Sequence, residues 1–181
     1  TKVPEEGGII NVPAILITMF LCILLVRGTK ETVMINRILV FVKLAVIVIF
    51  FVLAVPNIDP TNWDPFLPYG TQGISAGAAI VFFAYIGFDA VATSAEEAKN
   101  PSRDLPIGIL GSLGVCAVLY FFVALVLTGV VPYTDLNNAE PVAYALRVIG
   151  YPIGSAIVAV GAICGITTVL LVLLYGQARI F

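Results

Sequence analysis

Residues 105–131 read LPIGILGSLGVCAVLYFFVALVLTGVV and include no Asp, Glu, Lys or Arg. A helix needs about 20 residues to cross the roughly 30 Å hydrocarbon layer of a bilayer, and this run exceeds that length. A helix at the surface of a soluble bundle would carry a polar stripe, which this run lacks. The stretch therefore predicts a transmembrane helix.

Four more apolar stretches flank this run, and two of them are equally free of charge. Residues 9–26 and residues 148–178 contain no Asp, Glu, Lys or Arg. The other two enclose Lys43 and Asp89, respectively. The sequence thus predicts about five transmembrane helices, over residues 9–26, 33–55, 74–95, 105–131 and 152–178.

The composition agrees with an all-α membrane protein. Hydrophobic residues make up 60% of the 181 residues and charged residues 11%, whereas a soluble domain carries about 25% charged residues. The absence of histidine excludes His-based catalysis and His-ligated metals within this chain. The three cysteines, Cys22, Cys116 and Cys164, lie in apolar runs without disulfide or metal-ligand spacing. A net charge of −2 gives no indication of nucleic-acid binding, and no nucleophile–base pair indicates an enzyme or a cofactor.

The basic residues of the connecting segments predict an orientation. Two of them, Lys2 and Arg147, fall on one side of the predicted helices. Six fall on the other side: Arg27, Lys30, Arg37, Lys99, Arg103 and Arg179. The positive-inside rule assigns the six to the cytoplasm, so the chain would start outside the cell membrane and end in the cytoplasm.

The predicted outer loops have two further features. The aromatic residues Trp63, Tyr69 and Tyr133 would lie near the outer interface, where amphipathic rings are favoured. Residues 139–149 have apolar side chains at helical spacing, which predicts a short amphipathic helix.

Lys43 is the first candidate functional residue. It lies two helical turns beyond Arg37, roughly 9 Å deeper in the membrane at 1.5 Å per residue. A charge within a span is costly and normally faces a bundle interior or a water path. Because desolvation disfavours the ammonium form of a lysine, such a group can exchange a proton. The alternatives are a lysine that snorkels to the interface or a fixed ion-pair partner.

Asp89 ends the string FFAYIGFD, residues 82–89, in which small residues and Gly87 alternate with aromatic rings. Such a string can mark an interrupted helix, whose free backbone groups bind the polar ends of a substrate. The alternative is a continuous helix in which Gly87 allows close packing, because glycine is common in membrane helices.

Two polar groups of residues complete the candidates. Thr167 and Thr168 lie in the last span, where a hydroxyl often bonds back to its own helix. The charged residues Glu96, Glu97, Lys99, Arg103 and Asp104 surround Asn100 and Pro101. That cluster is typical of a solvated face, and its functional alternative is a cytoplasmic gate that exchanges ion pairs.

Three strings carry a resemblance to a known family. These are PEEGGIIN at residues 4–11, FFAYIGFD at residues 82–89 and AEEAKNPSRDLPIGI at residues 95–109. Together with Asn36 and Lys43 they resemble the bacterial cationic amino acid transporter family of the amino acid–polyamine–organocation superfamily. The resemblance covers nearly the whole chain. It implies a fold of about twelve helices built on a five-plus-five inverted repeat.

The resemblance assigns residues 1–181 to one partial transporter domain, the family's fourth to eighth transmembrane helices. The chain begins at Thr1 without an initiator Met, so we expect a fragment whose remaining transporter helices are separate from it. Residues 74–95 would be the discontinuous sixth helix, and backbone groups of Phe83, Ala84, Ile86 and Gly87 would bind the substrate. Lys43 would occupy the place of a sodium ion in sodium-coupled relatives, facing Thr167 and Thr168. Asp89 would join Glu96, Glu97, Lys99 and Arg103 at the cytoplasmic gate.

The function implied is secondary active amino acid transport, as proton-coupled symport by alternating access. The partners would be an amino acid substrate, protons as the coupling ion and membrane lipid, without cofactor or metal. The alternative is a membrane receptor or channel subunit, although no ring of charges or selectivity loop is visible in the sequence.

Overall fold

The computed structural model describes residues 11–27, 29–87 and 100–180, and its regular secondary structure in these ranges is entirely helical. The α-helices are α1 (Val12–Arg27), α2 (Thr29–Ala54), α3 (Gly70–Phe82), α5 (Pro101–Val130), α6 (Pro141–Val148) and α7 (Pro152–Ile180). Short 3-10 turns are η2 (Val55–Asn57), η3 (Pro60–Trp63), η4 (Phe83–Tyr85) and η6 (Tyr133–Leu136). The predicted all-α fold is confirmed for the described residues.

Three of the described helices are long and apolar enough to cross a membrane. Their apolar segments are Met34–Asn57, Pro101–Val130 and Pro152–Gln177. They correspond to the second, fourth and fifth predicted spans, and α5 begins earlier than predicted because proline is favoured at the first helical position. The shorter α1 has 16 residues and α3 has 13. The chain is therefore a multi-pass membrane protein.

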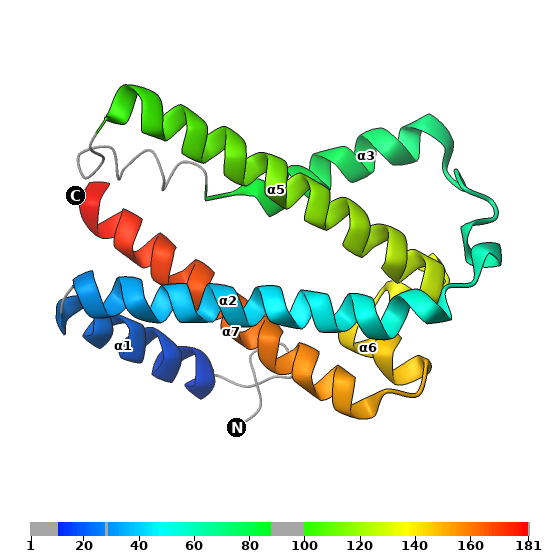
Figure 1. Ribbon diagram of the computed structural model, residues 1–181, viewed down its shortest axis with the longest axis horizontal. Coiled ribbons are helices and arrows are strands. Elements are labelled where there is room, and N and C mark those ends of the chain that lie inside the picture. Colours follow the sequence, from blue (N-terminus) through cyan, green and yellow to red (C-terminus); the bar gives the residue numbers. More distant parts are fainter. Residues whose placement is uncertain (1–10, 28, 88–99, 181) are drawn as a thin grey trace.

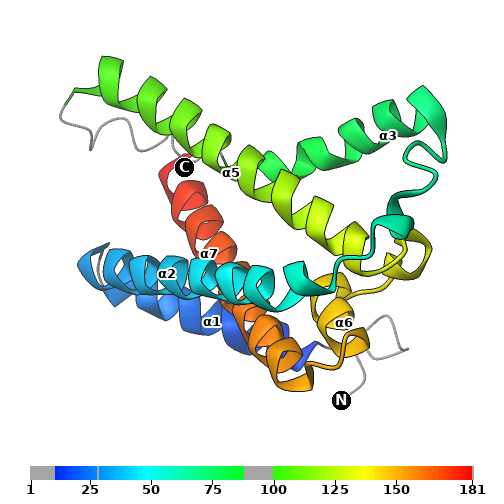
Figure 2. The same cartoon turned by 45° about the vertical axis from the view of Figure 1, so that its right-hand side comes forward.

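The long helices run between two ends of the molecule. Figure 1 shows the start of α2, the start of α5 and the end of α7 at one end. The opposite end contains the end of α2, the end of α5, α6 and the start of α7. In both Figure 1 and Figure 2, α7 crosses α2, and α1 lies beside α2. The first end has the connections that the sequence predicts to be cytoplasmic.

Two glycines of α7 let that helix approach α2 closely. A Cβ atom added to Gly161 would lie 2.7 Å from Val46 Cγ1, and one added to Gly154 would lie 2.7 Å from Leu53 Cδ1. Both distances are shorter than real Cβ contacts, so a larger residue would require a shift of Val46 at Gly161 and of the more flexible Leu53 side chain at Gly154. Val46 pairs with Gly161, and Leu53, seven residues later on α2, pairs with Gly154, seven residues earlier on α7. This pairing fixes an antiparallel register between the two helices.

The largest buried cluster lies at the end that includes α6. Its members come from α2, the end of α5, α6 and α7: Phe50, Ala54, Val126, Val130, Val131, Ala143, Ala145, Leu146 and Val158. The short helix α6 confirms the amphipathic helix predicted over residues 139–149, and its apolar face points into this cluster. On its polar face Arg147 pairs with Glu140 at 3.3 Å, an exposed contact that adds little stability.

The segment after α2 is bound to the end of α5. The backbone N–H of Asp59 and the side-chain amide of Asn62 both donate to the Gly129 carbonyl, each at 2.9 Å. The Trp63 indole N–H donates to the Thr128 hydroxyl at 3.3 Å. The hydroxyl and the backbone N–H of Thr61 donate to Asp59 Oδ1, and these hydrogen bonds lower the pKa of that carboxyl. The segment between α2 and α3 is thus ordered by polar contacts.

Candidate functional site

Helix α3 ends in the middle of the third predicted span. Its last residue is Phe82, and a single 3-10 turn follows over residues 83–85. Ile86 is extended with ψ of 133°, and Gly87 has φ of 123°, a conformation that favours glycine. The loss of regular helix predicted between Ala84 and Gly87 is therefore confirmed, and the alternative of a continuous helix is wrong at this point.

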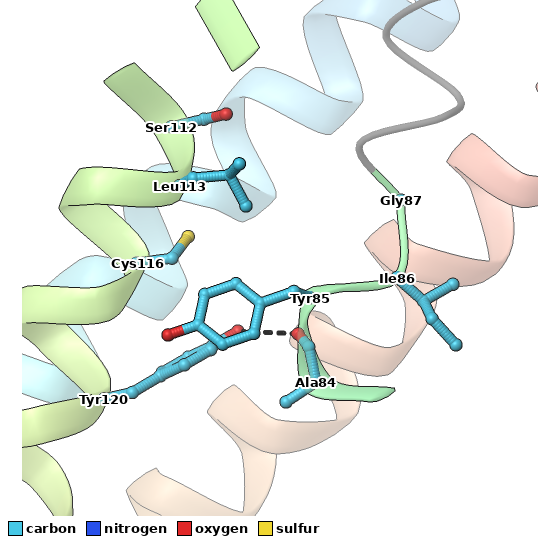
Figure 3. A pocket seen from close by; sticks show the side chains of 8 residues that line it. All are labelled: Ala84, Tyr85, Ile86, Gly87, Ser112, Leu113, Cys116 and Tyr120. Carbon is cyan, nitrogen blue, oxygen red and sulfur yellow. Dashed lines mark hydrogen bonds between the residues drawn. The ribbon is translucent and has the colours of Figure 1, made fainter. Parts of the chain in front are cut away.

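The carbonyl of Ala84 is directed toward α5. The chain has left the helical path at Ile86 and Gly87. The Ala84 carbonyl accepts from the Tyr120 hydroxyl of α5, at 3.3 Å (Figure 3). The rings of Tyr85 and Tyr120 meet edge to face, with centroids 5.5 Å apart.

A cavity of about 160 Å³ lies between this segment and α5. Residues 84–87 form one wall, and Ser112, Leu113, Cys116 and Tyr120 form the other (Figure 3). The Ser112 hydroxyl is already donating to the Ile109 carbonyl at 3.0 Å. The cavity therefore brings together three of the predicted substrate-binding residues, Ala84, Ile86 and Gly87.

Phe83 lies outside this cavity. Its ring is 68% exposed and contacts Phe82, with centroids 6.2 Å apart. Within the described residues, Phe83 is therefore not a core side chain.

Lys43 lies on the face of α2 that packs against α7. Lys43, Val46, Phe50 and Leu53 are spaced by three, four and three residues, which places them on one stripe of a helix. Val46 and Leu53 contact α7, as described above, and Lys43 is partly buried one turn further along. Two turns before Lys43 on the same stripe, the Asn36 Oδ1 atom is buried and has no hydrogen-bond partner among the described residues.

Thr168 lies seven residues after Gly161, on the face of α7 that packs against α2. It is 3% exposed, and its hydroxyl donates to the Gly165 carbonyl at 2.7 Å. The Thr167 hydroxyl donates to the Ile163 carbonyl at 2.8 Å. Both hydroxyls thus bond back to their own helix, and no hydrogen bond joins Lys43 to either threonine in the described part of the chain.

Most of the predicted cytoplasmic gate lies outside the described residues, namely Asp89, Glu96, Glu97 and Lys99. Arg103 is exposed in the first turn of α5. Asp104 Oδ2 accepts from the Asn100 backbone N–H at 3.2 Å, which stabilises the start of that helix.

Sequence reasoning missed Tyr120. It lies in the charge-free run that predicted a membrane helix, where its hydroxyl is one of a few polar groups. That hydroxyl was the available signal, because a phenol in an apolar span normally finds a partner.

A family comparison covers nearly the whole chain. Residues 3–181 match the model of a family described as amino acid permease. The chain belongs to the amino acid permease family. The resemblance inferred from the sequence is thereby confirmed at the level of the family and its helical fold.

Similar proteins from bacteria and plants support the assignment of this chain to the permease family. The chain is 46% identical over 174 residues to the "Methylthioribose transporter" of Bacillus subtilis (strain 168), covering 96% of this chain and 38% of that protein. It is 45% identical over 171 residues to the "Branched-chain amino acid permease BcaP" of the same organism, covering 94% and 37%. It is 44% identical over 177 residues to the "Cationic amino acid transporter 9, chloroplastic" of Arabidopsis thaliana, covering 97% and 31%. The chain spans about a third of the length of these relatives.

Proposed function

We propose that the full transporter containing this chain carries amino acids across the cell membrane by proton-coupled symport and alternating access. The observation that carries the proposal is the end of regular helix at Phe82, inside the third predicted span, with residues 84–87 lining a cavity beside α5. Discontinuous helices provide substrate sites of this kind in transporters. The names of two relatives, a branched-chain amino acid permease and a cationic amino acid transporter, support amino acids as the substrate class.

In this proposal the broken segment recognises the ammonium group of the amino acid. Carbonyl oxygens at Phe83, Ala84 and Ile86 are suitable acceptors, and Gly87 lets the chain turn. The carboxylate would be held by the first transmembrane helix, which the resemblance places outside this chain. Phe83, exposed beside the break, would close over the bound substrate as an outer gate.

Lys43 would carry the coupled proton. Its position on the α7-facing stripe of α2 supports this role, because an intramembrane lysine in a helix interface is shielded from lipid. Thr167 and Thr168 would supply hydroxyl oxygens near it. Their present hydrogen bonds leave each oxygen a lone pair that can accept a second bond.

The arrangement in the membrane is also a proposal. The chain would form one partial domain, the fourth to eighth helices of the transporter, completed by helices outside it and surrounded by lipid. Its start would lie outside, and its end would lie in the cytoplasm with the gate residues Asp89, Glu96, Glu97, Lys99 and Arg103. A transport mechanism of this kind needs no enzyme chemistry and no cofactor.

Uptake into proteoliposomes tests the proposal. The full-length protein should accumulate radiolabelled leucine or arginine when the pH outside is lower than the pH inside, and accumulation should collapse when a protonophore is added. Methylthioribose should be included as a competitor, because one relative is named for it. Downhill flux that ignores the proton gradient would favour a channel, and amino acid binding without flux would favour a receptor.

A further inference from the structure

The contacts between the broken segment and α5 are few. No residue of α3 or η4 is buried, and beyond its own continuation into η4, α3 has little contact with the other described helices. The cavity lies between residues 84–87 and the part of α5 from Ser112 to Tyr120. The direction of the Ala84 carbonyl therefore depends on a small number of specific interactions.

Tyr120 provides two of these interactions from one side chain. Its hydroxyl donates to the Ala84 carbonyl at 3.3 Å, and its ring lies edge-on to Tyr85, the next residue of the segment (Figure 3). A carbonyl oxygen has two lone pairs, so a bond from Tyr120 leaves one for a second donor. The hydroxyl can thus fix the carbonyl without using up its capacity to bind a ligand.

We propose that Tyr120 is a positioning residue, which holds the Ala84 carbonyl in the direction needed to accept a hydrogen bond from the ammonium group of the substrate. This inference rests on the proposed function and deepens it. Tyr120 acts through Ala84, and its hydroxyl need not touch the amino acid. The wall of the substrate site thereby extends to the middle of α5, to which sequence reasoning assigned no role in substrate binding.

The variant Tyr120→Phe isolates the hydroxyl. It keeps the ring and its contact with Tyr85 and removes only the hydrogen bond. The O···O distance of 3.3 Å is longer than the usual 2.5–3.0 Å, so the bond is weak. Loss of such a weak hydrogen bond removes binding free energy at the low end of the usual range. The Kd of the amino acid should therefore rise about two- to fivefold.

Tyr133→Phe is a matched control. Tyr133 also forms an edge-to-face pair, with Tyr69 at 6.1 Å, and its hydroxyl has no hydrogen-bond partner within the described ranges. In the full-length protein this substitution should leave the Kd of the amino acid unchanged. It therefore measures the effect of removing a phenol hydroxyl that holds no carbonyl.

The experiment measures binding of leucine or arginine, whichever stabilises the wild-type protein more, and of the N-methyl form of the same amino acid. N-methylation removes one N–H donor, so the wild type should bind this analogue more weakly. In Tyr120→Phe the Kd of the parent amino acid should rise about two- to fivefold, and the penalty for N-methylation should shrink by a similar factor. The substrate-free melting temperature should stay within about 2 °C of wild type, since one weak hydrogen bond is lost.

Two results would overturn the inference. An unchanged Kd would show that the hydroxyl does not position the carbonyl. A much lower melting temperature with an unchanged N-methylation penalty would make Tyr120 a packing residue only. If the wild-type protein bound neither amino acid, the proposed function itself would fail, and this inference would fail with it.

Discussion

The contact between Gly129 and Trp63 allows a quantitative prediction about the end of the molecule that includes α6. Gly129 is buried near the end of α5, and a Cβ atom added there would lie 2.7 Å from Trp63 Cζ2 and 3.0 Å from Ile58 Cγ2. The substitution Gly129→Ala therefore forces one of two changes. Either the contact is compressed, or the segment of residues 58–63 moves away from α5.

Both changes cost a similar amount of free energy. Overpacking a filled site by one methyl group costs about 1–3 kcal/mol. Moving the segment instead breaks the two hydrogen bonds to the Gly129 carbonyl, at about 1 kcal/mol each. Because the protein adopts the cheaper change, Gly129→Ala should lower the free energy of unfolding by about 1–3 kcal/mol. The gain in helix propensity from glycine to alanine, about 0.5–1 kcal/mol in water, offsets part of this loss.

A thermal-unfolding assay on the detergent-solubilised full-length protein would detect the change. We expect the melting temperature to fall by roughly 2–6 °C. The control Gly114→Ala lies on the same helix, and no described atom lies within 4 Å of its added Cβ. That substitution should not lower the melting temperature.

A double-mutant cycle identifies the cause. In a Trp63→Ala background the indole is absent, so most of the cost of Gly129→Ala should disappear. Equal destabilisation in both backgrounds would refute the reasoning, because the clash would then not involve Trp63. A Gly129→Ala protein that melts like wild type would refute it as well.

Three further predictions concern transport by the full-length protein. Lys43→Ala should abolish proton-driven uptake. Lys43→Arg should do the same, because a guanidinium does not release its proton. Uptake with a normal pH dependence in either variant would contradict the proton-carrier role. Phe83→Ala should raise the Kd of the substrate. The substrate-free melting temperature should stay near that of the wild type, because the ring is mostly exposed in the described structure. A variant that melts much earlier, yet gains the normal stabilisation from substrate, would make Phe83 a packing residue. Single cysteines at Arg37 and Arg103 should resist an impermeant thiol reagent added from outside, whereas one at Thr134 should react, and the reverse pattern would invert the proposed orientation.

The sequence predicted the long helices because a membrane span needs only length and the absence of charge. Residues 105–131 satisfy both conditions without reference to the rest of the chain. The amphipathic helix over residues 139–149 was predictable for the same reason, since helical spacing of apolar residues is a local property. The structure moves the ends of these helices by a few residues.

The break at Ala84–Gly87 could not be decided from local pattern. Glycine and aromatic residues are common in continuous membrane helices, and only the family resemblance favoured an interruption. Tyr120 and Gly129 were missed for a different reason. Their roles depend on Ala84 and Trp63, which lie far away in the sequence, and a single sequence does not show which distant residues pair. The Tyr120 hydroxyl indicated only that some partner was needed. Most of the predicted gate lies outside the described residues and stays a prediction.

The close contacts at Gly154 and Gly161 restrict how α7 can shift along α2. If α7 slid past α2 by one turn, Val46 would meet Gly165, but Leu53 would meet the buried side chain of Val158. A slide in either direction cannot seat both side chains on glycine, because the spacing of seven residues is matched at one register only. We therefore expect α2 and α7 to move as one unit, without sliding past each other. Lys43 and Thr168 lie on this shared unit, so their positions relative to each other would be kept when the unit moves.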